Sequence, residues 1–115
     1  MIGVDIESIT RFNKLGRRKD KNFLERVFSV RELAYCYAKK NPAEHLAARF
    51  AGKEAVNKAL AGLNRKAVPF NEIEILTNRR GVPSVKLKNY SIKVSLSHGA
   101  GQALACALIT HAHEL

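Results

Sequence analysis

The stretch RFAGKEAVNKAL, residues 49–60, has the composition of a helix, because alanine and other helix-forming residues fill most of its positions. One adjacent pair of charges, Lys53 and Glu54, interrupts its apolar pattern. At 3.6 residues per turn, Glu54 lies one turn from both Phe50 and Lys58, so we expect its carboxylate to be partly desolvated. Two interpretations fit: an ordinary Glu54–Lys58 pair on a helix surface, or a carboxylate held beside a metal ion.

The residues before this helix predict a strand and further helices. Residues 2–6 alternate between apolar and other side chains, as a strand with one apolar face does. Residues 8–15 are expected to form a short helix that a glycine ends. Ser29 and Glu32 have the spacing of a capping box, which predicts a helix over residues 30–39.

The second half of the chain predicts strands. Four segments alternate or are rich in strand-forming residues: NEIEILTN (71–78), SVKLK (84–88), SIKVSLS (91–97) and QALACALIT (102–110). An N-terminal strand and helices followed by an antiparallel meander define an α+β fold. The length of 115 residues suits one domain over residues 1–115.

The composition is typical of a globular protein. Hydrophobic residues make up 46% of the chain and charged residues 26%, as in globular proteins. No apolar run approaches the ~20 residues of a membrane helix, and the N-terminus does not resemble a signal peptide. Cys36 and Cys106 stand far apart in no ligand-like pair, so we expect two reduced, buried thiols in a cytoplasmic protein without a membrane partner.

The net charge of +10 favours polyanionic partners, because it raises the rate at which they associate. Nucleic acid, an acidic protein and a phosphate-rich small molecule all fit this charge. A small basic nucleic-acid-binding domain is therefore one alternative. Against it, the chain has no Trp, few aromatic residues and no paired Cys and His motif.

Asp5 favours the metal interpretation of Glu54. It lies in a short apolar strand, where its simplest role would be to cap the following helix, yet Ser8 already offers a cap. Two carboxylates on different elements suit Mg²⁺, which takes the rest of its coordination from water and substrate phosphates. Basic residues on the helix would then face phosphate, namely Arg49, Lys53 and Lys58.

Several motifs, taken in order, resemble the holo-acyl-carrier-protein synthases, the small AcpS-type phosphopantetheinyl transferases. They are GVDI, FLERVFSVRE, RFAGKEAVNKAL, NRRGVPSV, IKVSLSH and ALACALI, and they extend over nearly the whole chain. The resemblance implies a phosphopantetheinyl-transferase-like α+β fold and a homotrimer with active sites at subunit interfaces. It also implies transfer of the 4′-phosphopantetheine arm of coenzyme A to a serine of acyl carrier protein. Such enzymes use Mg²⁺ and release adenosine 3′,5′-bisphosphate.

The resemblance also implies roles for individual residues. Asp5 and Glu54 match the Mg²⁺-binding carboxylates, and Glu54 also matches the group that deprotonates the serine, directly or through water. The coenzyme A site is matched by Arg49, Lys58, Gly81, Pro83 and His98, with Lys58 near the pyrophosphate. The segment that receives the acidic carrier protein is matched by Arg11, Phe23 and Arg26.

Two segments depart from the family pattern. The loop AGLNRKAV keeps only Gly62 where relatives often have a glycine-rich loop, and residues 84–92 leave room for a turn instead of a helix. We therefore expect part of the coenzyme A pocket or of the trimer surface to be rebuilt. A magnesium-dependent nuclease or phosphatase is a further alternative, although two carboxylates are few for that chemistry.

Overall fold

The computed structural model describes residues 1–111. The strands are β1 (Ile2–Ser8), β2 (Glu74–Thr77), β3 (Pro83–Lys86), β4 (Tyr90–Gly99) and β5 (Gln102–His111). The α-helices are α1 (Ile9–Asn13), α2 (Lys21–Val27), α3 (Val30–Tyr37) and α4 (Pro42–Gly62), and a single 3₁₀ turn, η1 (Phe70–Glu72), precedes β2. No helix in this described part of the chain has the length and apolarity needed to cross a bilayer.

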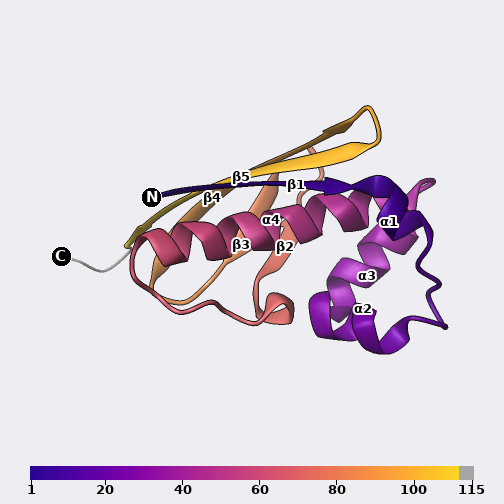
Figure 1. Cartoon of the computed structure of the whole chain (residues 1–115), viewed down its shortest axis with the longest axis horizontal. Coiled ribbons are helices and arrows are strands. Elements are labelled where there is room, and N and C mark those ends of the chain that lie inside the picture. Colours follow the sequence, from indigo (N-terminus) through magenta and orange to yellow (C-terminus); the bar gives the residue numbers. More distant parts are fainter. Residues whose placement is uncertain (112–115) are drawn as a thin grey trace.

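The long helix α4 is the centre of the architecture (Figure 1). A three-stranded antiparallel sheet of order β1–β5–β4 lies along one side of it, and β2 and β3 form a separate antiparallel hairpin. Helices α1, α2 and α3 gather near one end of α4. The N-terminal strand therefore pairs with the last strand of the chain, with Asp5 opposite Ala105.

Small side chains let the sheet lie close to α4. The inward positions of β5 are Ala103, Ala105, Ala107 and Ile109, all fully buried. They face helix positions that include Ala51, Ala55 and Ala59, which are also buried. Alanine on both surfaces shortens the distance between helix and strands, and this brings backbone and side chains of β1 into contact with α4.

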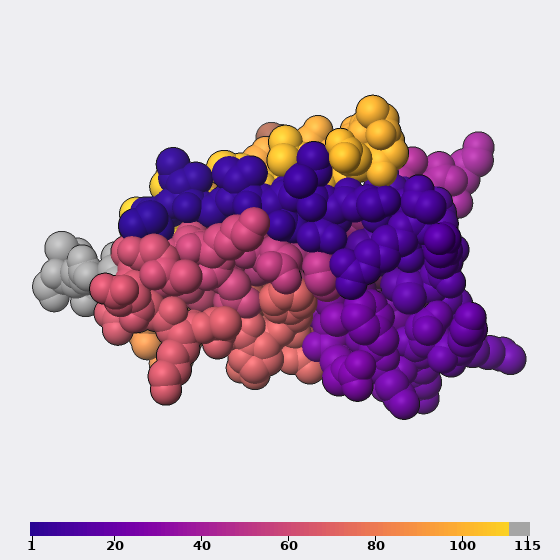
Figure 2. Space-filling model, in the orientation of Figure 1, coloured from indigo at the N-terminus to yellow at the C-terminus, as the bar shows by residue number. Residues whose placement is uncertain are grey.

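The opposite face of the sheet is apolar and exposed. On β1, Ile2 is 62% exposed, Val4 51% and Ile6 54%, and across from them Leu104 and Leu108 of β5 are each 45% exposed. Figure 2 shows β1 lying along the surface of the molecule beside the yellow strand β5. Cys106, which we expected to be buried, lies on this face and is exposed, whereas Cys36 is buried as expected.

The α+β class is confirmed, with differences in detail. The capping box at Ser29 and Glu32 is present and starts α3, and the next helix, expected from Pro42 to about Leu60, spans Pro42–Gly62. The sequence did not reveal α2, which follows the basic loop. The strands form a sheet and a separate hairpin instead of one meander: β3 pairs with β2 and not with β4, and β1 adds to the sheet beside β5.

Candidate active site

The face of α4 that meets β1 carries Lys58, one of the predicted phosphate residues, beside the predicted metal ligand Asp5 of β1. Lys58 Nζ donates to Asp5 Oδ1 at 3.1 Å and to the Val4 carbonyl at 3.0 Å. The Asp5 side chain is only 11% exposed. Lys58 therefore pairs with Asp5, and within residues 1–111 no ion pair joins it to Glu54, so the simple Glu54–Lys58 helix pair is not what the structure contains.

Gly3 permits this contact between strand and helix. A Cβ atom built at Gly3 would lie 1.9 Å from the Ala55 carbonyl oxygen and 2.9 Å from the Ala59 nitrogen. Both neighbours are backbone atoms of α4, which cannot move aside as a flexible side chain would. The absence of a side chain at this position sets how closely Asp5 approaches α4.

We expect Gly3→Ala to destabilise the protein by about 1–3 kcal/mol, because the added methyl overlaps the helix backbone. Urea unfolding followed by circular dichroism measures this loss. Gly99→Ala is the matched control, since no atom lies within 4 Å of a Cβ built there. Equal midpoints for the two variants would contradict the close approach.

A third carboxylate, Glu7, lies beside the two that were predicted. Burial, followed by the neighbouring Asp5 carboxylate, raises the pKa of Glu7 to about 7, and Glu54 adds to the rise. Arg11 opposes it through an ion pair at 3.3 Å. Glu7 was not among the predicted site residues, although its position two residues after Asp5 places both on one face of β1.

These carboxylates fit a hard cation. Asp5 Oδ2 is buried and has no hydrogen-bond partner, so this oxygen is free to accept a ligand. Repulsion between neighbouring carboxylates disfavours their ionised forms. A bound cation offsets this repulsion and stabilises the ionised forms. Within residues 1–111 no group of three or more His, Cys, Asp or Glu side chains is placed to hold a metal ion, so a cation here would have at most two carboxylate ligands from the chain. This suits Mg²⁺, which keeps water and substrate phosphate in its coordination shell.

A cavity of about 270 Å³ brings together four of the residues predicted to bind coenzyme A. Arg49, Gly81, Pro83 and His98 all line it, although they come from α4, the turn after β2, the start of β3 and the end of β4. The predicted pyrophosphate residue Lys58 does not line this cavity and lies with Asp5 instead. The predicted site residues therefore fall into two groups: those at the cavity, and those at the carboxylate cluster of Asp5, Glu7 and Glu54.

Arg49 is held firmly at the wall of this cavity. Its Nη2 donates to Thr77 Oγ1 at 2.6 Å, and its guanidinium carbon lies 4.3 Å from the centre of the Tyr35 ring. Its Nε is buried and lacks a hydrogen-bond acceptor. A buried guanidinium with an unused donor suits a phosphate ligand.

Tyr35 and His45 also line the cavity, and the sequence analysis assigned neither of them. The His45 ring lies edge-on to Tyr35 and to His98, with centroids 5.8 Å and 6.4 Å away. Burial, followed by Arg49 and Lys39, lowers the pKa of His45. His98 is exposed and lies 3.7 Å from the Glu44 carboxylate.

Lys53, which precedes Glu54 in the sequence, lies in the core and not at the surface of the site. It is fully buried, and its Nζ donates to Glu32 Oε1 at 2.7 Å and to the carbonyls of Phe70 and Ile73. Glu32, also fully buried, accepts from the backbone nitrogens of Ser29 and Ile75. Burial lowers the pKa of Lys53, and the Glu32 carboxylate opposes this shift. The expectation that Lys53 faces phosphate was wrong.

The residues predicted to receive the carrier protein lie on α1 and α2. Arg11 and Arg26 are exposed and Phe23 is half-buried. The Arg11 guanidinium lies over the Phe50 ring at 5.0 Å and pairs with Glu7. The ion pair with Glu7 places Arg11 directly beside the carboxylate cluster.

Comparisons with known proteins identify the family of the chain. The family model of the 4′-phosphopantetheinyl transferase superfamily matches residues 1–109. The holo-[acyl-carrier-protein] synthase of Chlorobaculum parvum is 41% identical over 113 residues, covering 94% of this chain and 96% of that protein. The enzyme of the same name from Aquifex aeolicus is 44% identical, with coverages of 95% and 97%.

The fold also resembles that of a solved structure. Helicobacter pylori holo-[acyl-carrier-protein] synthase, in complex with coenzyme A, superposes with a TM-score of 0.81 at 34% identity, covering 96% of this chain and all of that chain. The chain belongs to the phosphopantetheinyl transferases, in the holo-[acyl-carrier-protein] synthase family. It is therefore an enzyme of the transferase class, as the sequence resemblance implied.

Proposed function

We propose that this protein transfers the 4′-phosphopantetheine arm of coenzyme A to a serine of apo acyl carrier protein, with release of adenosine 3′,5′-bisphosphate. The observation that carries the proposal is the meeting of Arg49, Gly81, Pro83 and His98 at one cavity, within a chain of this family. The names of the relatives support the same substrates. The family assignment favours this enzyme over a nucleic-acid-binding domain.

The residues at the site have different proposed roles in binding coenzyme A. Arg49, with its unused Nε donor, and His98 hold phosphate groups of coenzyme A at the cavity. Gly81 has φ of 80°, so the turn before Pro83 presents backbone without a side chain to the nucleotide. Lys58 holds Asp5 in place, and its ammonium would stabilise the negative charge that develops on the pyrophosphate.

Asp5 and Glu54, with Glu7 beside them, would hold Mg²⁺. The ion supplies charge neutralisation for the pyrophosphate when it is bound. Glu54 is half-buried and accepts the proton of the carrier-protein serine, directly or through a water molecule. Arg11, Phe23 and Arg26 receive the acidic carrier protein next to this cluster, and the Arg11–Glu7 pair joins the two regions.

Chromatography tests this reaction directly. The protein is mixed with coenzyme A, Mg²⁺ and apo acyl carrier protein, and adenosine 3′,5′-bisphosphate is measured over time. We expect release only when the carrier protein is present. Equal release with and without it would indicate a hydrolase and contradict the proposal.

The exposed apolar face of the sheet supports a homotrimer with sites between subunits. A cavity of about 270 Å³ is small against the ~300–1,000 Å³ typical of ligand pockets, so coenzyme A needs a further wall. Five exposed aliphatic side chains on β1 and β5 form a patch of the kind that marks an interface, namely Ile2, Val4, Ile6, Leu104 and Leu108. A second and third copy would cover the patch and complete the pocket.

We expect Leu108→Lys to convert the trimer to monomer and to weaken coenzyme A binding at least about tenfold, because a lysine would be buried without a partner. Light scattering measures the mass, and calorimetry measures the binding. Val30→Lys is the control, since Val30 is 84% exposed and lies on α3, away from the sheet. A Leu108→Lys protein of unchanged mass would contradict this interface.

A further inference from the structure

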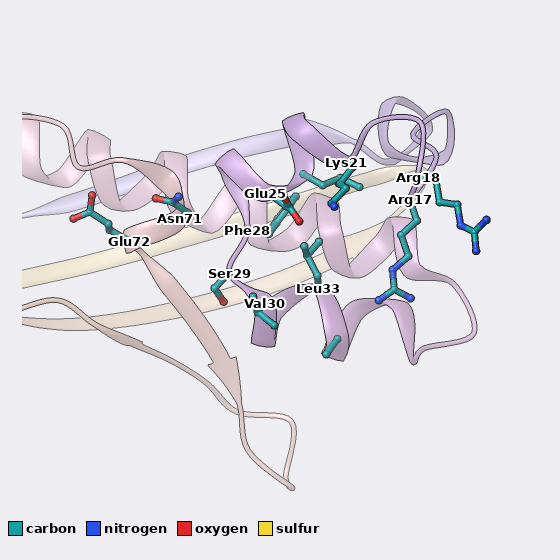
Figure 3. A pocket seen from close by; sticks show the side chains of 12 residues that line it. Arg17, Arg18, Lys21, Glu25, Phe28, Ser29, Val30, Leu33, Asn71 and Glu72 are labelled. Carbon is teal, nitrogen blue, oxygen red and sulfur yellow. The ribbon is translucent and has the colours of Figure 1, made fainter.

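Helix α3 borders two hollows with different faces. Val30 and Leu33 line the larger one, of about 1020 Å³, and Figure 3 shows both on α3, near Phe28 of α2. Tyr35 instead lines the cavity of about 270 Å³ around Arg49. Because successive residues of a helix point about 100° apart, Tyr35 lies on a different face of α3 from the other two. The Tyr35 ring is therefore a wall of the cavity proposed to hold coenzyme A.

The face of the Tyr35 ring supports the Arg49 guanidinium. The guanidinium carbon lies 4.3 Å from the ring centre, which is the geometry of a cation–π contact. Arg49 is only 2% exposed, and a contact of this kind is stronger where water is excluded. Thr77 Oγ1 accepts a hydrogen bond from Arg49 Nη2 at 2.6 Å. The ring and the hydroxyl together therefore fix the plane of the guanidinium.

The ring supports Arg49 without using its hydrogen-bond donors. A guanidinium carries five N–H donors at its edge, whereas an aromatic ring contacts its face. Within residues 1–111 no carboxylate forms an ion pair with Arg49, and its buried Nε has no acceptor. A carboxylate partner would occupy these donors and offset the positive charge. An aromatic partner leaves both the donors and the charge available to a phosphate.

Neighbouring side chains hold the Tyr35 ring in this position. The His45 ring of α4 lies edge-on to it, with the two ring centres 5.8 Å apart. His45 also lies edge-on to His98 at 6.4 Å, so the ring that supports Arg49 is linked to the second residue proposed to bind phosphate. Lys39 Nζ, four residues after Tyr35, lies 4.6 Å from the centre of the same ring. The ring therefore lies within a row of aromatic and cationic side chains.

The core fixes the rotation of α3 and hence the direction of Tyr35. Cys36, the next residue, is fully buried, and so is Glu32, three residues before Tyr35. Glu32 Oε1 accepts from Lys53 Nζ at 2.7 Å, which ties α3 to α4. A rotation of α3 that moved Tyr35 off Arg49 would break this buried ion pair. The ring and the guanidinium are therefore ordered before a ligand arrives, which lowers the entropic cost of binding.

We propose that Tyr35 is a positioning residue for coenzyme A binding: its ring holds the Arg49 guanidinium so that the free donors are available to a phosphate of the ligand. The inference rests on the proposed function, since coenzyme A supplies the phosphate. Tyr35 acts through Arg49 by its ring and not by its hydroxyl. Its effect is on binding and not on the chemical step, because Arg49 lines the cavity whereas Asp5 and Glu54 do not.

Calorimetric titration of the full chain with coenzyme A, in the absence of metal, tests this role. We expect Tyr35→Leu to weaken binding about tenfold, and Tyr35→Phe, which keeps the ring, to weaken it by less than about twofold. Tyr37→Leu is the matched control, because Tyr37 lies on the same helix with Arg17 over its ring at 4.7 Å and does not line the cavity. In initial-rate measurements, Tyr35→Leu should raise KM for coenzyme A about tenfold and change kcat by less than about twofold.

A double-mutant cycle with Arg49→Met shows whether Tyr35 acts through Arg49. We expect Tyr35→Leu/Arg49→Met to bind coenzyme A about as weakly as Arg49→Met alone. Losses that add would overturn the proposal. Parent-like affinity in Tyr35→Leu, with a parent that still transfers the phosphopantetheine arm, would overturn this proposal and leave the proposed function intact. A parent that neither binds coenzyme A nor transfers the arm would overturn both.

Nitrogen-edited NMR of the ligand-free protein tests the position of Arg49 without any substrate. The ring current of Tyr35 should shift the Arg49 Nε–H signal, because the guanidinium lies over the ring. We expect this shift in the parent, in Tyr35→Phe and in Tyr37→Leu, and its loss in Tyr35→Leu. An Arg49 signal that stays unchanged in Tyr35→Leu would overturn the proposal, whatever ligand the cavity binds.

Discussion

Glu54→Gln is expected to lower the turnover of phosphopantetheine transfer by about 10²–10⁴-fold at saturating Mg²⁺. The substitution keeps the shape of the side chain but removes both its negative charge and its ability to accept a proton. Glu54 lies close enough to Glu7 for its charge to contribute to the raised pKa of Glu7. Loss of this charge would weaken the cation site and remove the proposed base together. Initial rates of adenosine 3′,5′-bisphosphate release measure the effect.

Two controls separate this effect from damage to the fold. Glu54 is only half-buried and has no ion-pair partner within residues 1–111, so the thermal midpoint of the variant should match that of the parent. Binding of coenzyme A in the absence of metal should also persist, because Arg49 and His98 are unchanged. Full turnover in Glu54→Gln would refute both the metal role and the base role of this carboxylate.

Lys53→Met has the largest expected effect on stability, a loss of about 3–5 kcal/mol. The variant leaves the Glu32 carboxylate fully buried without its cation, and leaves the carbonyls of Phe70 and Ile73 without the donor they share. A domain of this size has about 5–15 kcal/mol of stability in total, so much of it would be lost. Urea unfolding measures the change, and Lys88→Met, at an exposed lysine, should change it by less than about 0.5 kcal/mol.

The double variant Lys53→Met/Glu32→Gln tests the cause. Because no net charge would then remain buried, part of the lost stability should return. A double variant whose loss of stability equals the sum of the two single losses would show that the pair does not act as a unit. The network would then be a set of independent hydrogen bonds.

The sequence predicted those elements whose signals are local. The capping box at Ser29 and Glu32 requires only neighbouring residues, and it starts α3 as expected. The alanine-rich composition likewise predicted α4. The second short helix, α2, was not predicted, because it follows a run of charged residues and has no side chain that caps its first turn.

The burial of Lys53 could not be predicted from its own surroundings in the sequence. Its partner Glu32 lies 21 residues away, and the two carbonyls that complete its shell belong to η1 and the residue after it. A lysine next to a glutamate in an alanine-rich stretch has the pattern of a helix surface. Only the packing of α3, α4 and η1 makes it a buried cation.

The candidate site was predicted in part because family motifs carried its residues, whereas spacing alone could not bring them together. Arg49 and His98 are 49 residues apart in sequence and line one cavity because α4 and β4 pass each other. Glu7 was missed because alternation along β1 was interpreted as a polar surface. In the structure, Gly3, Asp5 and Glu7 face α4, and the apolar residues between them are exposed.

The intact mass of the carrier protein tests the proposed reaction most directly. Apo acyl carrier protein and coenzyme A are incubated with this protein in Mg²⁺, and in parallel with a chelator. We predict that the carrier protein gains the mass of one phosphopantetheine arm, only with Mg²⁺ and only at its acceptor serine. An unchanged mass with several apo carrier proteins would contradict the account, as would equal modification in the chelator.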